Sequence, residues 1–179
     1  MTKPEQCWDW ETHTPKNFRR PRVGLVLSSG AAKGLAHIGV IQVFEETGIP
    51  VHAVAGASMG AYVGGLWAAG QSGVQLEELA LSMKESRDRL ELIDPVFPPR
   101  RGFIRGDKIA NRLRATLGET NIENLPRDLS IIATELESFR RKVFREGDLV
   151  NAIRASIAIP GICVPYTLDG IDYVDGGIA

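Results

Sequence analysis

The chain has 179 residues, 44% of them hydrophobic and 24% charged, which suits one globular domain that can bury its own core. Its formal net charge of −1 argues against a nucleic-acid-binding protein. Two cysteines, Cys7 and Cys163, are too few and too far apart for a disulfide framework or a zinc site, and they fit a reducing compartment.

The N-terminal segment, residues 1–21, is polar and carries mixed charge. It lacks the apolar run of a secretory signal, and no stretch of the sequence is long and apolar enough to span a bilayer. We therefore expect a loosely organised N-terminal arm over residues 1–21, a single domain over residues 22–179, and a cytoplasmic location.

Two strand–helix units follow one another in the first part of this domain. Residues 23–27 are typical of a buried strand, a loop of small residues covers 28–34, and apolar residues at helical spacing predict a helix over 33–46. A second buried strand is expected over 51–55 and a helix of small apolar residues over 59–69. Two successive units of this kind predict an α/β fold with a parallel sheet.

The second half predicts three more helices, two strands and a hairpin. Helices are expected over 74–84, over 107–117 with Asp107 as its cap, and from a cap at Asp148 to about Ser156. Buried strands are expected over 129–136 and 142–144. Asp169-Gly170, between residues 166–168 and 171–174, indicates a β-hairpin with a primed turn.

Residues 84–105 change character, because arginines alternate with bulky apolar residues and prolines interrupt the run. One interpretation is a solvated, irregular excursion between helices. The other is a segment that contacts a lipid surface peripherally. A long loop without regular structure is uncommon in a compact domain unless it has a function. If the second interpretation holds, removing the charges of Arg100, Arg101 and Arg105 weakens binding to anionic vesicles.

Ser58 stands in the pentapeptide Gly56-Ala57-Ser58-Met59-Gly60, between a predicted strand and a predicted helix. A serine raised on so sharp a turn needs neighbours with almost no side chain two positions away, and Gly56 and Gly60 meet that need. The N-terminal amides of the following helix would face negative charge developing at the serine. The pattern indicates a nucleophile. The alternative is a tight turn that needs its glycines for packing alone.

A nucleophilic serine needs a base, and the histidines do not follow the order found in α/β-hydrolases, where the histidine comes last. All of them precede Ser58: His13, His37 and His52. Asp175 is a candidate instead, because it follows a predicted strand and precedes two glycines that let the backbone approach another element closely. A partly desolvated carboxylate can deprotonate a serine directly. Asp-Gly-Gly is also a common turn composition, which is the alternative.

The loop from Ser28 to Gly34 has small side chains at every position except Lys33. Several of its backbone N–H groups would share one concavity at a helix N-terminus, which suits a developing oxyanion, and Lys33 would add positive charge nearby. A phosphate-binding loop is the weaker interpretation, since neither G-x-x-x-x-G-K-[ST] nor G-x-G-x-x-G is present.

Taken in this order, the motifs resemble those of the patatin-like phospholipases. That family has a G-G-G-x-[RK]-G loop after its first strand, then G-x-S-x-G, then D-G-[GA]. The corresponding segments here are the loop ending at Ala31-Ala32-Lys33-Gly34, residues 56–60, and residues 175–177. A fourth block, Ala155-Ser156-Ile157-Ala158-Ile159-Pro160-Gly161, is similar to the family's A-S-x-A-x-P segment. The resemblance runs from about Arg22 to the last residue and is strongest to the short bacterial branch, related to the catalytic domain of neuropathy target esterase.

The resemblance implies a three-layer α/β/α fold with a mainly parallel central sheet, and no metal or organic cofactor. It implies that Ser58 is the nucleophile and Asp175 the general base, with an oxyanion hole and motif glycines at these positions: Gly30, Ala31, Lys33 and Gly34; Gly56, Gly60, Gly176 and Gly177. Ser29 and Ala31 replace glycines of the family's first loop. Only two residues follow the Asp-Gly-Gly motif, whereas relatives continue, so we expect the domain to be truncated at its C-terminal end.

These expectations lead to functions of two classes. The first is a serine lipid acyl hydrolase (a phospholipase, lysophospholipase or esterase) that acts on a lipid or acyl ester through an acyl-enzyme. The second is a catalytically silent binding or regulatory module with the same fold. Acyl transfer to an acceptor other than water is a further alternative to hydrolysis.

Overall fold

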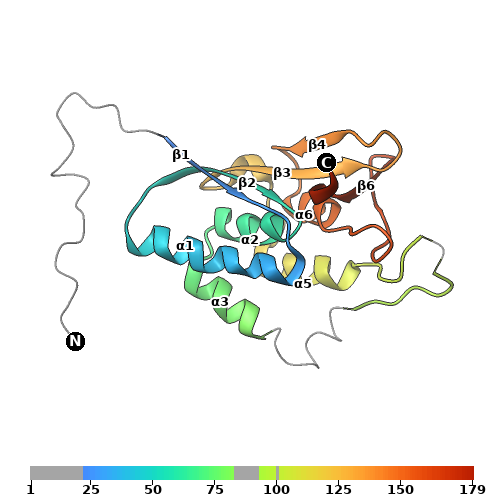
Figure 1. The fold of residues 1–179 in the computed structure, drawn as a ribbon, viewed down its shortest axis with the longest axis horizontal. Helices are drawn as coiled ribbons and strands as arrows, with labels where there is room; N and C mark the ends of the chain where they lie inside the picture. The colour runs from blue at the N-terminus through green and yellow to red at the C-terminus, as the bar shows by residue number, and fades with distance from the viewer. Residues whose placement is uncertain (1–21, 83–92, 100) are drawn as a thin grey trace.

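The computed structural model describes residues 22–82, 93–99 and 101–179, with a sheet lying above a layer of helices (Figure 1). The predicted arm over residues 1–21, residues 84–92 of the arginine-rich segment, and Arg100 lie outside the described residues. None of the helices within the described ranges is long and apolar enough to cross a membrane.

Three parallel strands form one side of the sheet: β1 (Val23–Leu27), β2 (Val51–Ala57) and β3 (Asp128–Glu135). β1 leads into a 3₁₀ turn, η1 (Ala31–Ala36), and then α1 (His37–Glu46), while β2 leads into α2 (Met59–Ala68). The predicted α/β class, built on successive strand–helix units and parallel strands, is confirmed.

β3 has neighbours along both of its edges, and their register sets up the site. β4 (Arg141–Phe144) is antiparallel to β3 and pairs with residues 131–134. Because Ile132 pairs with both β2 and β4, these two strands lie on opposite edges of β3. The antiparallel strand β6 (Ile171–Asp175) pairs with residues 133–135 and continues along the edge that β2 occupies. β2 and β6 therefore run toward each other and end at adjacent positions of β3.

The last two strands form the predicted hairpin. β5 (Tyr166–Leu168) pairs with β6 in antiparallel fashion. Asp169 has φ 51° and Gly170 has φ 79°, so both central residues of the turn are left-handed, as a primed turn requires. After β6 the chain forms a short 3₁₀ turn, η3 (Gly176–Ile178), which lies close to the sheet in Figure 1.

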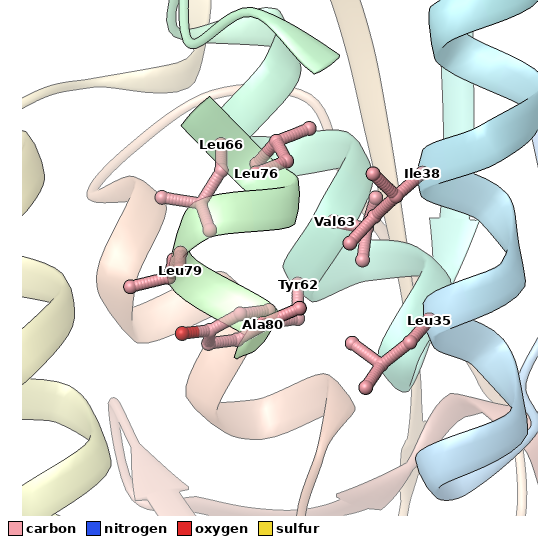
Figure 2. A pocket seen from close by; sticks show the side chains of 8 residues that line it. All are labelled: Leu35, Ile38, Tyr62, Val63, Leu66, Leu76, Leu79 and Ala80. Atoms are coloured by element: carbon pink, nitrogen blue, oxygen red, sulfur yellow. The ribbon is translucent and has the colours of Figure 1, made fainter. Parts of the chain in front are cut away.

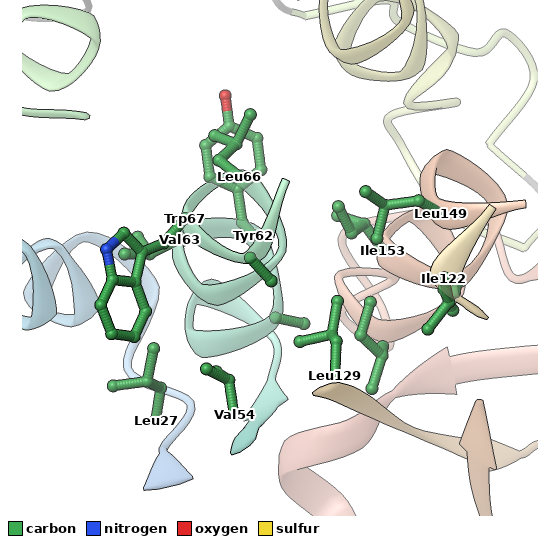
Figure 3. Close-up of a cluster of buried hydrophobic side chains, with 14 of the residues drawn as sticks. Leu27, Val54, Tyr62, Val63, Leu66, Trp67, Ile122, Leu129, Leu149 and Ile153 are labelled. Atoms are coloured by element: carbon green, nitrogen blue, oxygen red, sulfur yellow. The ribbon is translucent and has the colours of Figure 1, made fainter. Parts of the chain in front are cut away.

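The core lies between the sheet and the two helices α2 and α6 (Leu149–Ser156) (Figure 3). Leu27, Val54 and Leu129 point from three strands toward α2 and α6, whose residues Val63 and Ile153 belong to the same buried cluster. Every residue of α2 from Gly60 to Ala68 is buried, because its glycines and alanines let the helix approach the sheet closely. The opposite face is more open, as Val26 is 77% exposed there.

α3 (Gly73–Ser82) packs against α1 and α2 and encloses a small pocket (Figure 2). The lining consists of aliphatic side chains and the ring of Tyr62. Since the Tyr62 hydroxyl is the one polar side-chain group among these residues, the pocket belongs to the packing between the three helices.

The prediction that Asp107 caps its helix is wrong. α5 (Asp107–Leu117) has Gly106 at its N-cap position, with φ 84°. Glycine has no side chain that could accept a hydrogen bond from the first turn of the helix. Asp94 does the capping from the preceding loop, since its carboxylate accepts from the N–H groups of Gly106 (2.6 Å), Asp107 (2.6 Å) and Lys108 (3.2 Å). Burial raises the pKa of Asp94, but these backbone hydrogen bonds outweigh it and hold that pKa below its ordinary value.

A second predicted cap is confirmed. Asp148 precedes α6, and its side chain accepts a hydrogen bond from the N–H of Asn151 at 2.7 Å. The same carboxylate receives two hydrogen bonds from Arg114 of α5, which ties the two helices together. Between α5 and β3 the chain forms one further 3₁₀ turn, η2 (Ile122–Asn124).

Candidate active site

Ser58 occupies the sharp turn between β2 and α2, with φ 53° and ψ −121°. A serine with positive φ is strained, so surrounding contacts must hold it there. Gly56 and Gly60 allow the turn, because a Cβ at Gly56 would lie 2.6 Å from the Gly60 carbonyl carbon and one at Gly60 would lie 2.8 Å from the Ser28 carbonyl oxygen. The Ser58 side chain is thereby presented at the N-terminus of α2, where positive partial charge concentrates.

The structure brings Ser58 and Asp175 into direct contact. The Ser58 hydroxyl donates a hydrogen bond to Asp175 Oδ2 at 2.5 Å, although the two residues are 117 positions apart. Ala57 pairs with Ile132, and Asp175 pairs with the next residue, Ala133. The contact follows from this register, because the end of β2 meets the end of β6 on one edge of β3. Ser58 is 5% exposed and Asp175 6% exposed, so the pair is shielded from bulk water.

Further contacts hold Asp175 from several sides. Its Oδ1 accepts from the N–H of Gly177 at 2.7 Å, and its carbonyl oxygen accepts from the hydroxyl of Thr134 at 3.1 Å. Gly176 has no room for a side chain, since a Cβ would lie 2.6 Å from the Ile132 carbonyl carbon. The glycines of Asp-Gly-Gly therefore let the end of β6 lie directly against β3.

The loop from Ser28 to Gly34 lies beside the turn that carries Ser58. Gly34 is buried, and a Cβ there would lie 2.6 Å from Cβ of Met59, the residue after Ser58. Ala31 has φ 46°, so the loop turns sharply before η1 begins. In the described part of the chain, the backbone N–H groups of Gly30 and Ala31 have no backbone acceptor. Lys33 donates its N–H to the Gly30 carbonyl at 3.0 Å and is exposed at the surface.

The two histidines within the described residues bind backbone groups. His37 Nε2 lies 2.8 Å from the carbonyl oxygen of Ser28, and His52 Nδ1 accepts from the N–H of Val23 at 3.1 Å. His37 thus anchors the start of the loop, and His52 helps to fix the first strand. His13 lies outside the described residues.

Ser156 and Ala158 also contact the two candidate residues, although the sequence motifs assign them no role. The Ser156 hydroxyl accepts from the N–H of Ser58 at 2.8 Å, and the Ala158 carbonyl accepts from the N–H of Asp175 at 2.9 Å. The signal in the sequence is the block from Ala155 to Gly161, which matched a family pattern without a role attached.

The arrangement contains the parts needed for attack by an alcohol. Ser58 Oγ has a carboxylate in hydrogen-bond contact, and the loop that contains Gly30 and Ala31 lies beside the turn that carries Ser58. Over the described ranges, the structure holds no group of three or more His, Cys, Asp or Glu side chains that could hold a metal ion.

Comparison with known proteins agrees with the motifs. The family model "Patatin-like phospholipase" matches residues 25–179. An uncharacterized NTE family protein of Mycobacterium tuberculosis is 45% identical over 160 residues, which cover 88% of this chain and 43% of that protein. A protein of Cryptococcus neoformans named lysophospholipase NTE1 is 32% identical over 160 residues, which cover 87% of this chain and 10% of that protein. The chain thus spans less than half the length of these relatives.

A solved structure shows the same fold at lower sequence identity. The crystal structure of VipD from Legionella pneumophila superposes with a TM-score of 0.59 at 19% identity, over 88% of this chain and 46% of that one. The similarity confirms the predicted fold class, and the match to the family model extends across both the serine turn and the Asp-Gly-Gly end of β6. The chain therefore belongs to the patatin-like phospholipase family.

Proposed function

We propose that residues 22–179 form a serine lipid acyl hydrolase in which Ser58 and Asp175 are the catalytic dyad. The observation that supports this most strongly is the 2.5 Å hydrogen bond from Ser58 Oγ to Asp175 Oδ2, between two residues that are both buried. Asp175 takes the proton of Ser58 as Oγ attacks the ester carbonyl carbon, and the alcohol leaves with a proton returned by Asp175. The carboxylate then deprotonates a water that attacks the acyl-enzyme, which releases the fatty acid and restores Ser58.

The oxyanion formed during each attack needs donors that are in place beforehand. The N–H groups of Gly30 and Ala31 are suited to this role, because they lack backbone acceptors in the described part of the chain and their loop abuts Met59. Gly34 allows the close approach, and Lys33 closes the loop through its backbone N–H. The oxygen atom of a bound ester carbonyl would lie between this loop and the turn of Ser58.

The substrate class we propose is a lysophospholipid or a related carboxylic ester. Membership of the family and the name of the Cryptococcus neoformans relative support a lipid ester. A catalytically silent module with this fold is the competing function, and the retained Ser58–Asp175 contact favours the enzyme over it. Acyl transfer would use the same first step and differ in the acceptor.

Labelling with a fluorophosphonate separates the two functions. We expect the wild-type chain to take up one phosphonyl group at Ser58 and to hydrolyse a p-nitrophenyl acyl ester and lysophosphatidylcholine, whereas Ser58→Ala does neither. Ser138→Ala is the matched control, since Ser138 is exposed in the turn between β3 and β4. Undiminished ester turnover by purified Ser58→Ala would contradict the assignment, and an unlabelled wild type would favour the silent module.

We also propose that the protein is cytoplasmic and contacts membranes peripherally through the described part of the segment 84–105. Phe97 is 95% exposed and Phe103 61% exposed, and the hydrogen bond from Val96 N–H to the Phe103 carbonyl holds their backbones together. Arg101 and Arg105 lie on the same loop, more than half exposed. Exposed aromatic side chains beside arginines suit the surface of an anionic bilayer.

Co-sedimentation with anionic phosphatidylserine-containing vesicles tests this contact. We expect Phe97→Ser with Phe103→Ser, and separately Arg101→Gln with Arg105→Gln, to reduce the bound fraction severalfold. Phe139→Ser is the control, because Phe139 is 72% exposed in the turn between β3 and β4. Equal binding by all variants would remove the membrane contact from the proposal.

A further inference from the structure

The short segment from Ser156 to Ala158, at the end of α6, touches both members of the dyad. Ser156 is fully buried, and its hydroxyl accepts from the N–H of Ser58 at 2.8 Å while donating to the Ile132 carbonyl at 2.6 Å. Two residues later, the Ala158 carbonyl accepts from the N–H of Asp175 at 2.9 Å. One turn of chain therefore holds the backbone of the nucleophile and the backbone of the base.

The N–H of Ser58 depends on this side chain. The pairing of β2 with β3 ends one residue earlier, at Ala57, and the first N–H groups at a helix N-terminus have no partner within the helix. Ser58 is also buried and its backbone has a positive φ. Its buried N–H therefore needs an acceptor placed to suit this uncommon backbone conformation. In the described part of the chain the acceptor is Ser156 Oγ.

A carbonyl group of β3 fixes the direction in which the Ser156 hydroxyl donates its proton. Its proton goes to the Ile132 carbonyl, which leaves a lone pair directed at the N–H of Ser58. Ile132 pairs with Ala57, and the next residue of β3 pairs with Asp175. The hydroxyl thus ties the serine turn to the same stretch of β3 that fixes the carboxylate.

We propose that Ser156 is a positioning residue that sets the separation between Ser58 Oγ and the Asp175 carboxylate, an inference that rests on the proposed function. Within the described residues, Ser156 Oγ is hydrogen-bonded to the N–H of Ser58 and to the Ile132 carbonyl and not to Ser58 Oγ or the Asp175 carboxylate, so it acts through the backbone of Ser58. Loss of the hydroxyl lets the turn relax from its strained conformation and move Oγ away from its base.

The test compares the rate constant and the final extent of Ser58 phosphonylation by a fluorophosphonate in wild type, Ser156→Ala and Ile153→Val. Ile153 is equally buried on the same helix, and its truncation loosens the core without a contact to the dyad. We expect Ser156→Ala to label to full stoichiometry with a rate constant about 10- to 100-fold lower, and kcat for ester hydrolysis to fall by a similar factor with little change in KM. Ile153→Val should label at the wild-type rate.

A purely structural role would give a different pattern. Ser156→Ala would then label more weakly in extent but at the wild-type rate constant, and that result overturns the inference. If Ser156→Ala does not fold, Ser156→Cys takes its place, because a thiol has similar shape and accepts hydrogen bonds weakly. A slower rate at full extent in Ser156→Cys supports the inference, and a wild-type rate overturns it.

The inference and the proposed function fail in distinguishable ways. If wild type is not phosphonylated, the proposed function fails and the positioning role fails with it. If wild type is labelled at Ser58 and Ser156→Ala matches its rate constant, only the role of Ser156 is refuted. A crystal structure of Ser156→Ala gives a readout independent of activity: we expect Ser58 Oγ to lie beyond 3.5 Å, the usual hydrogen-bond limit, from Asp175.

Discussion

Replacing Gly60 by alanine should disable the site, although alanine is the better helix former. A Cβ at position 60 would lie 2.8 Å from the Ser28 carbonyl oxygen and 2.5 Å from the Leu27 carbonyl carbon. A Cβ atom essentially never comes within 3.0 Å of a heavy atom outside its own residue and its chain neighbours, and both of these atoms belong to the backbone. The start of α2 or the end of β1 would therefore have to move by roughly 1 Å, a forced overpacking of the core.

Two effects on stability oppose each other in this variant. Exchange of glycine for alanine inside a helix stabilises by about 1 kcal/mol, whereas overpacking a close contact costs about 1–3 kcal/mol. A clash with backbone cannot be relieved by rotating a side chain, so we expect the upper part of that range and a net loss of about 1–2 kcal/mol. The effect on rate should be larger, since a displacement of about 1 Å in the reacting groups can cost about 10²-fold.

The assay measures thermal unfolding and the rate constant of Ser58 phosphonylation for Gly60→Ala beside a matched control. Gly39→Ala is that control, because Gly39 is an exposed helical glycine in α1 whose added Cβ would meet nothing within 4 Å. Gly39→Ala should raise the Tm slightly and leave the rate unchanged. A Gly60→Ala protein with the wild-type Tm and the wild-type rate would refute the packing of α2 against the end of β1.

Two further substitutions test the core and the cap of α5. Leu66 is 1% exposed, so Leu66→Ala should lower the free energy of unfolding by about 2–5 kcal/mol in urea titration; a loss below about 1 kcal/mol would contradict its place in the core. Asp94→Asn should lower the Tm at pH 7, and the difference in Tm between wild type and this variant should shrink as pH falls. The pKa of Asp94 is lowered in the folded state, so its stabilising charge is present above the ordinary aspartate range and is lost as pH falls through the folded pKa. A difference in Tm that does not change with pH would argue against a stabilising role for the negative charge of Asp94 at the cap of α5.

Most helices, strands and turns could be predicted from the sequence, because their signals lie within a few neighbouring residues. The apolar run at residues 23–27 coincides with β1, and Asp169-Gly170 adopts the two left-handed conformations that its composition favours. Asp148 caps the helix that begins at the next residue, as expected. Asp94 was missed because it lies 13 residues before the N–H of Asp107, in an irregular loop, where no spacing rule connects a cap to its helix.

The site shows the same division between local and long-range information. The motifs identified Ser58 and Asp175 as candidates, but their contact depends on β2 and β6 ending at adjacent residues of β3. That register is a tertiary property, set by strands far apart in the chain. The contact between Ser156 and Ser58 spans 98 positions, so no sequence spacing predicted it.

The dyad is tested most directly by the rate constant of Ser58 phosphonylation in Asp175→Asn. Asparagine keeps the size of the side chain and an oxygen that can accept from Gly177, but it cannot take the proton of Ser58. We predict a folded protein whose labelling is slower by about 10²- to 10⁴-fold, the usual contribution of a general base. A folded Asp175→Asn protein that is phosphonylated at Ser58 as fast as wild type would contradict the role of Asp175 and, with it, the proposed mechanism.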